Sequence, residues 1–384
     1  MLKKIIILLI VLGIAAFAAL NVLSKNAPEL LRGAVERALG KRVTVGDIDY
    51  RWPGHFVLSR FVVYEDSPFA SEIAFAVDRL ELEVEMGALR RQVLHIRRVD
   101  IAGAQAALRK KGGVVYHFLS AALRPSPPSA VSGDASATPA AGLPIRIDRV
   151  RLEGCEVRFM DYDVRQDGYA LVLETLTGEL ERVELPPGRE WTTYDLTGRL
   201  VQGRSARPAD GAFRGRTRLS DAETDAVLSA TGVWLPYMAP YLSRLTAAQF
   251  DEGRFDLRAD MSISGGVYNA NLHIELSQLH LREAEPGDQV FGVGSEQLLS
   301  YVRDESGYLR LRLPVQWDLR DASAKPYEVL RSSFQRALKD LVLSRIGTIA
   351  VESVLKTPDT VPSKEASKNR LEDGVEKVRD FLKF

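Results

Sequence analysis

The stretch Ile145-Arg-Ile-Asp-Arg-Val-Arg-Leu-Glu153 alternates apolar and charged side chains over most of its length. Successive side chains of a β-strand point to opposite faces, so this pattern is typical of a strand with one apolar and one solvated face. Similar runs fill the chain from Arg42 to Ile101 and continue to Tyr308–Pro314. Gly, Asp and Pro turns separate them. The sequence therefore predicts a mainly β body over 42–319, built from antiparallel strands.

The apolar face of these strands fits two architectures. A sandwich or barrel would cover it with a second layer, whereas a single elongated, curved antiparallel sheet would leave it open as a β-groove, or half-pipe. An open apolar trough suits lipid acyl chains, because each buried methylene contributes about 0.8 kcal/mol. The side chains expected to line such a groove follow from alternation, and a register slip would exchange the faces. They are Phe159, Leu171, Leu173, Leu257, Met261, Leu272, Ile274, Leu311 and Leu313.

An apolar run from Ile5 to Leu23 precedes the β body. At about 1.5 Å per residue it is long enough to cross a hydrocarbon core of roughly 30 Å. Two lysines precede the run and only Lys25 follows it closely, which favours a cytoplasmic N-terminus and an exported body. Ala16-Phe-Ala18 also fits a signal-peptidase site, so a cleaved signal peptide is the alternative to an uncleaved anchor.

Helical spacing and composition divide the rest of the chain. The residues after Asn26 predict a short amphipathic helix that stops at Gly40. Apolar residues three or four apart return near the C-terminus at Phe334, Leu338, Leu341/Val342 and Ile346, and these helices either cap the open end of the sheet or contact a membrane or partner. The expected organisation is a transmembrane anchor at 1–25, a helix-plus-strand region at 26–123, a Pro/Ser/Ala-rich linker at 124–143, a β-groove region at 144–325 and amphipathic helices at 326–384.

Overall composition argues against some classes of function. Lys plus Arg and Asp plus Glu both total 51, so the formal net charge is zero. A chain without an excess of basic residues lacks the positive charge that holds the phosphate backbone, which argues against nucleic acid as its main partner. The single cysteine, Cys155, cannot form an internal disulfide.

No catalytic or metal-binding motif stands out in the sequence. The five histidines (His55, His95, His117, His273 and His280) lack the spacing of a helical zinc motif, so structural or solvated roles are expected. The segment Asp161–Gly168 has some calcium-loop character but places Arg165 in a liganding slot, which favours an acidic turn. The sequence therefore predicts a non-enzymatic protein without a cofactor or metal.

Several longer segments carry a family resemblance. Leu39–Asp49 (LGKRVTVGDID) leads into paired strands, and Val157–Asp163 (VRFMDYD) ends a strand with Asp. Trp234–Leu242 (WLPYMAPYL) places a short helix before a long strand, and Glu296–Val315 joins a helix, Asp-x-x-Gly, a strand and Leu-Pro-Val. Together these segments resemble the AsmA family of Gram-negative envelope proteins, and the last resembles an AsmA-like subfamily. The chain departs from the family at Gln316–Asp318, where Gly often follows Leu-Pro-Val.

The resemblance implies a periplasmic body on an inner-membrane anchor. It also implies a β-groove akin to that of chorein-type bridge lipid-transfer proteins. A role in cell-envelope biogenesis follows, through binding or transfer of phospholipid or another acyl lipid, with envelope proteins as further partners. The alternative is a non-enzymatic assembly scaffold with the same strands and a filled core.

Overall fold

The computed structural model describes the chain over several stretches. They are residues 32–33, 35–36, 40–51, 53–65, 68–69, 72–117, 144–203, 207–242, 250–281, 303–321 and 328–341. The expected anchor at 1–25 and linker at 124–143 lie outside them. Within the described stretches, no helix combines the length and apolar character needed to cross a membrane.

The protein is mainly β, as predicted, and its strands form one sheet of fifteen. The chain divides into two compact units: unit 1 is Met1–Leu228 with Ile263–Gly265, and unit 2 is Ser229–Ser262 with Gly266–Phe384. The strands up to the boundary are β1 (Val43–Thr44), β2 (Ile48–Arg51), β3 (His55–Tyr64), β4 (Ile73–Val84), β5 (Leu94–Ala102), β6 (Gln105–Lys111), β7 (Val114–Tyr116), β8 (Ile145–Asp161), β9 (Tyr169–Leu185), β10 (Thr192–Val201) and β11 (Ala209–Arg218).

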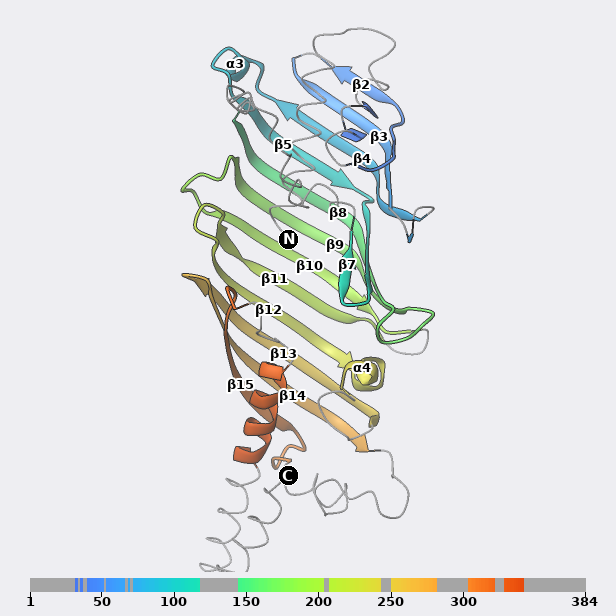
Figure 1. Cartoon of the computed structure of the whole chain (residues 1–384), viewed down its shortest axis with the longest axis vertical. Coiled ribbons are helices and arrows are strands. Elements are labelled where there is room, and N and C mark those ends of the chain that lie inside the picture. Colours follow the sequence, from blue (N-terminus) through green and yellow to red (C-terminus); the bar gives the residue numbers. More distant parts are fainter. Residues whose placement is uncertain are drawn as a thin grey trace, which may run out of the picture. The chain divides into compact units, whose positions relative to one another are not determined.

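Strand β12 (Glu223–Trp234) runs across the boundary between the two units, and three further strands follow it. These are β13 (Phe250–Ser264), β14 (Val267–Leu281) and β15 (Leu309–Asp318). The helices are α3 (Met86–Leu89), α4 (Leu235–Leu242) and a helix over 328–341. The sheet order is β1-β3-β4-β5-β8-β9-β10-β11-β12-β13-β14-β15, with β2 beside β3 and the β6–β7 hairpin beside β4 and β8 (Figure 1).

The sheet is antiparallel at most of its steps, but β8 runs parallel to both β5 and β6. The expectation of a wholly antiparallel sheet is therefore wrong here. Strand β5 pairs with the first part of β8, and β6 pairs with the last part. The chain turns between β5 and β6 at Gly103, whose φ is 64°. The chain then needs a long connection before β8 to return in the same direction, which parallel pairing requires.

The core of unit 1 lies on one face of its sheet, which we call the apolar face of unit 1. Val150 pairs with Val99 on one side and with Leu180 on the other. The exposed fractions of Val99, Val150 and Leu180 are 0%, 0% and 2%. Burying such a side chain fully contributes about 1.5–3 kcal/mol. The other buried members on β3 to β9 are Phe56, Leu58, Phe61, Val63, Phe75, Val77, Leu80, Leu82, Val84, Leu94, Ile96, Ile101, Ile145, Ile147 and Val183.

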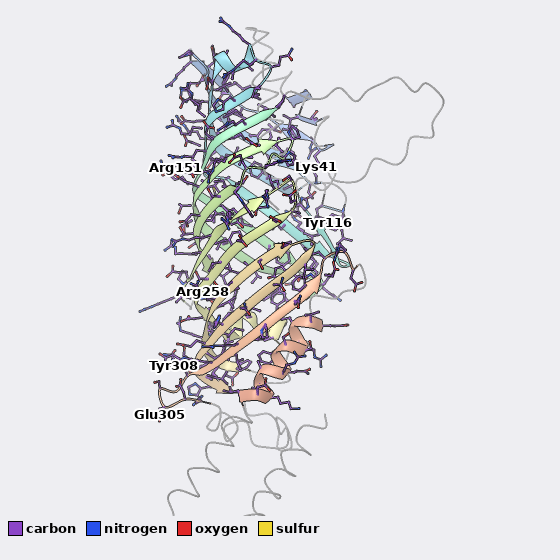
Figure 2. All side chains as sticks on the ribbon, turned by 90° about the vertical axis from the view of Figure 1, so that its left-hand side faces the viewer. Lys41, Tyr116, Arg151, Arg258, Glu305 and Tyr308 are labelled. Atoms are coloured by element: carbon purple, nitrogen blue, oxygen red, sulfur yellow. The ribbon has the colours of Figure 1, made fainter. Side chains whose placement is uncertain are left out.

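The opposite side of unit 1 is a charged face. Arg214 on β11 pairs with Asp195 on β10 at 2.8 Å, and both side chains are exposed. Figure 2 shows Arg151 on the opposite side of the ribbon from Lys41. An exposed pair of this kind contributes about 0–1 kcal/mol, so these residues keep one face solvated and add little stability.

Unit 2 buries its own apolar cluster under a helix. Leu272 pairs with Leu313 and Ile274 with Leu311 across the β14–β15 hairpin. The helix over 328–341 packs on this cluster through Val329, Leu330, Phe334, Ala337 and Leu341. In Figure 2 this helix lies on the side of the ribbon opposite the labelled Arg258.

Candidate functional site: the apolar face of unit 1

Three of the predicted lipid-contact residues are brought together on β8 and β9. Phe159 pairs with Leu171, and Val157 pairs with Leu173. Directly opposed residues in an antiparallel pair share a face. The same face continues onto β10, because Leu173 of β9 pairs with Leu200 of β10.

This face extends over two further strands of unit 1. Leu196 of β10 pairs with Phe213 of β11. On β12, alternation from Ala226 places Leu228 on the same face, since a Cβ at Gly215 would lie 2.8 Å from the Ala226 Cα. Leu196, Phe213 and Leu228 were not among the lipid-contact residues predicted from the sequence.

Exposure changes along the apolar face. On β3, β4 and β5 it is sealed: Phe61, Leu80 and Ile96 are 0%, 1% and 0% exposed. On β8 to β12 the same face is mixed: residues such as Val150 and Leu180 are buried, whereas other apolar positions are only half-buried. The half-buried positions are Val157, Phe159, Leu171, Leu173, Leu176, Leu196, Leu200, Phe213 and Leu228. Apolar side chains that stay partly open on neighbouring strands form a patch that can receive another apolar group. We call these nine residues the open apolar patch.

Backbone irregularities accompany the patch. Thr175 and Arg182 of β9 have φ values of 51° and 58°, in the left-handed region that residues other than glycine rarely adopt. The register of β9 against β10 shifts next to Thr175, between Thr197 and Arg199. β-Bulges of this kind bend and twist a strand, so β9 is shaped locally where it carries the patch.

The predicted residues of unit 2 have a different environment. Leu257, Met261, Leu272 and Ile274 are half-buried on β13 and β14. By contrast Leu311 and Leu313 on β15 are 3% and 1% exposed, within the cluster that the helix over 328–341 packs on. These two side chains are therefore core residues of unit 2 and form no part of an open surface.

The C-terminal helix explains that difference. Of the apolar positions singled out in the sequence, Phe334 and Leu341 pack on the unit 2 cluster. Leu338 is half-buried, and Ile346 lies outside the described residues. This packing is on apolar side chains of the sheet, so capping of its open end and contact with a membrane or partner both stay predictions.

The Asp at the end of β8 organises a turn. The Asp161 carboxylate is 1% exposed and accepts hydrogen bonds from the backbone N–H groups of Asp163 and Val164 at 3.0 and 3.2 Å. Arg165 pairs with Asp167 at 2.6 Å. The segment is thus a hydrogen-bonded turn, as expected. Within the described stretches, no group of three or more His, Cys, Asp or Glu residues is placed to hold a metal ion.

Asp163 ties this turn to the β6–β7 hairpin. Its carboxylate accepts hydrogen bonds from the backbone N–H groups of Gly112 and Gly113 at 2.5 and 2.9 Å. The contact with Gly113, followed by that with Gly112, lowers the pKa of Asp163 below its ordinary value. Tyr116 of this hairpin, labelled in Figure 2, packs its ring edge-on against Phe69 at 5.6 Å.

A row of hydroxyl groups lies beside the open apolar patch. Tyr194 pairs with Gly215 on β11, so its ring meets no opposing side chain on that strand and stacks on Phe213 at 4.8 Å. Its hydroxyl lies 3.5 Å from the Thr217 Oγ1, which lies 3.2 Å from the Thr224 Oγ1. Desolvation raises the pKa of Tyr194. This row was not predicted from the sequence, because alternation does not show which residues of β10, β11 and β12 lie opposite one another.

A buried ionic cluster near the start of unit 1 was also missed. Lys41 pairs with Glu65, and both side chains are 0% exposed. Arg109 Nη1 lies 3.8 Å from Glu65 Oε2, and Arg109 Nη2 lies 2.7 Å from Glu72 Oε2. This cluster joins the residues before β1 to the ends of β3 and β6. Among the described residues, the cluster holds two cations and two carboxylates in mutual contact, an arrangement typical of a structural ion-pair network.

His95 on β5 contacts a carboxylate from each of two other parts of unit 1. Its Nδ1 lies 2.7 Å from Glu85 Oε2, just before α3, and its Nε2 lies 2.8 Å from Asp148 Oδ2 on β8. The geometry is consistent with the structural role expected for the histidines.

Comparison with protein-family models, curated proteins and solved structures finds no match to this chain.

Proposed function

We propose that this chain is a non-enzymatic, membrane-anchored protein that binds lipid acyl chains on the open apolar patch of unit 1. In this proposal it belongs to the AsmA-like proteins, with its anchor in the inner membrane and its body in the periplasm. Its role is the binding or transfer of lipid during envelope biogenesis. The observation that supports it most is the patch of nine half-buried apolar side chains on five neighbouring strands, beside strands where the same face is sealed.

The size of the patch suits part of an acyl chain. Neighbouring strands lie about 4.8 Å apart, so the four steps from β8 to β12 cover roughly 19 Å. Ten methylene groups taken out of water there would contribute about 8 kcal/mol before the cost of association. A chain of that kind needs no specific polar partner along its length. This fits the apolar character of Leu171, Leu173 and Phe213.

Local backbone shape supports a groove. The register shift beside Thr175 bends β9, and Arg182 of β9 and Arg60 of β3 add left-handed backbone, with φ values of 58° and 54°. In the proposal these bends contribute to a curved half-pipe with the apolar face inside. The charged face, with pairs such as Arg149 and Glu181 at 3.6 Å, stays in water.

Unit 2 favours a second candidate function, that of an assembly scaffold. Leu311 and Leu313 are sealed by packing that includes the helix over 328–341. Strands with a filled core hold a shape and present a surface to partner proteins without taking up a lipid. In that account envelope proteins are the partners.

Lipid extraction tests the proposal. The purified full chain is mixed with liposomes that carry a phospholipid with a fluorescent acyl chain at self-quenching density, so that extraction raises the fluorescence. We expect extraction by the wild type and a large loss in Leu173→Glu, because a carboxylate then lies in the acyl-chain path.

The matched control is Val172→Glu, since Val172 pairs with Arg158 and lies on the charged face of the same strand. This variant should extract lipid as the wild type does. Absence of extraction by the wild type, or equal losses in both variants, would favour the scaffold.

A further inference from the structure

We infer that the hydroxyl row of Tyr194, Thr217 and Thr224 recognises the ester carbonyls of a bound acyl lipid and so selects ester-linked over ether-linked lipids. The inference rests on the proposed function, and it adds a polar recognition element to a patch otherwise defined by hydrocarbon contact. The row contains three hydroxyls from three neighbouring strands of unit 1.

The register places the row directly beside the open apolar patch. Along β11, Phe213, Gly215 and Thr217 alternate on the apolar face. Because Gly215 has no side chain, the Tyr194 ring can lie between Phe213 and Thr217, stacked on the first with its hydroxyl near the second. An acyl chain on Phe213 would therefore end next to hydroxyl groups.

Hydrogen-bonding capacity remains within the row. Three hydroxyls carry three O–H donors, and the two contacts within the row use two of them. Those contacts, at 3.5 and 3.2 Å, are longer than the 2.7–2.8 Å that O–H···O bonds prefer, so the hydroxyls bind each other weakly. A carbonyl oxygen accepts such a donor, whereas an ether oxygen is a poorer acceptor.

Burial and charge point to the same class of ligand. Tyr194 is 6% exposed, while Thr217 and Thr224 are half-buried, so a group that reaches the row loses most of its water. Burying a charged head group beside neutral hydroxyls would be costly, because the three hydroxyls of the row carry no charge to compensate it. A neutral ester carbonyl has a smaller desolvation cost and gains a hydrogen bond. The row thus fits the linkage region of an acyl lipid rather than its head group.

The test compares two unlabelled competitors in the lipid-extraction assay: dioleoyl phosphatidylcholine and its ether-linked analogue with the same chains. For the wild type we expect the ester lipid to compete about three- to tenfold better, the effect of about one hydrogen bond. Thr217→Val and Thr224→Val, which keep the side-chain shape, should bring the ratio close to one.

The matched control is Thr197→Val on the charged face. It removes a hydroxyl contact of the same length, that between Thr177 and Thr197 at 3.2 Å. Its competition ratio should equal that of the wild type, and its melting temperature reports the cost of losing such a contact. Extraction with a wild-type ratio near one, or an unchanged ratio in Thr217→Val, would overturn the inference and leave the lipid-binding proposal standing. Absence of any extraction would overturn both.

Discussion

Removing either partner of the buried Lys41–Glu65 pair should destabilise unit 1, and the two losses should be unequal. Glu65 lies between two cations, since Arg109 Nη1 is 3.8 Å from its Oε2. Arg109 also has Glu72, at 2.7 Å. Loss of Lys41 therefore leaves Glu65 with a nearby cation, whereas loss of Glu65 removes a carboxylate that lies near both Lys41 and Arg109.

The structure sets the expected magnitudes. Both side chains are 0% exposed, and removing one member of a buried pair costs about 3–5 kcal/mol because the remaining charge is uncompensated. We expect Glu65→Gln to cost that amount. Lys41→Met should cost roughly half of it, about 2 kcal/mol, because Arg109 still offsets the Glu65 charge. The double variant should be more stable than the sum of the single losses predicts, by about 1–3 kcal/mol.

Urea unfolding followed by far-ultraviolet circular dichroism measures these differences. The control is Asp47→Asn, which breaks the exposed pair with Arg60, a 2.7 Å contact whose side chains are 74% and 75% exposed. It should cost less than about 1 kcal/mol. The reasoning is refuted if Glu65→Gln is no more destabilising than this control, or if Lys41→Met is the more destabilising of the two core variants.

Three other predictions concern single side chains. Leu313→Ala should lower the free energy of unfolding by about 2–5 kcal/mol, because Leu313 is a core residue. Leu173→Ala should lower it by clearly less, because Leu173 is only half-buried; equal losses in urea unfolding would contradict the distinction between core and patch. The lowered pKa of Asp163 means that its contact with Gly113 stabilises the hairpin above pH 3.8 and is lost as the pH falls through the lower folded pKa. Selective amide NMR of Gly113 should therefore show a midpoint below 3.8, and a midpoint at or above it would refute the contact. Cys155 is 3% exposed, and burial raises the pKa of its thiol, so maleimide should modify it far more slowly in the native protein than in denaturant; equal rates would show that this part of β8 is open.

Much of the fold follows from alternation in the sequence. The run that begins at Ile145 corresponds to β8, which also begins there. The last strand is longer than the predicted Tyr308–Pro314, since β15 continues to Asp318. Pro314 does not end it because, among the described strands, β15 pairs with β14 alone, and an edge strand tolerates a residue that lacks the backbone N–H.

Other features depend on information that alternation does not carry. A period of two gives the face of each side chain but not the direction of its strand, so the parallel step from β5 to β8 was not predicted. It also cannot tell what covers a face: Leu173 and Leu313 have the same local pattern, yet one is half-buried and the other is in the core. Lys41 and Glu65 lie 24 positions apart, and only the fold brings them together.

Site-resolved photolabelling tests the central claim most directly. The full chain is placed in lipid nanodiscs that contain a phospholipid with a diazirine on its acyl chain, irradiated, and analysed by peptide mass spectrometry. The account predicts labelling at Leu171, Leu173 and Phe213 and none at Val172, which lies on the charged face of β9. Labelling of Val172 equal to that of its two neighbours, or no labelling of β8 to β12, would contradict the account.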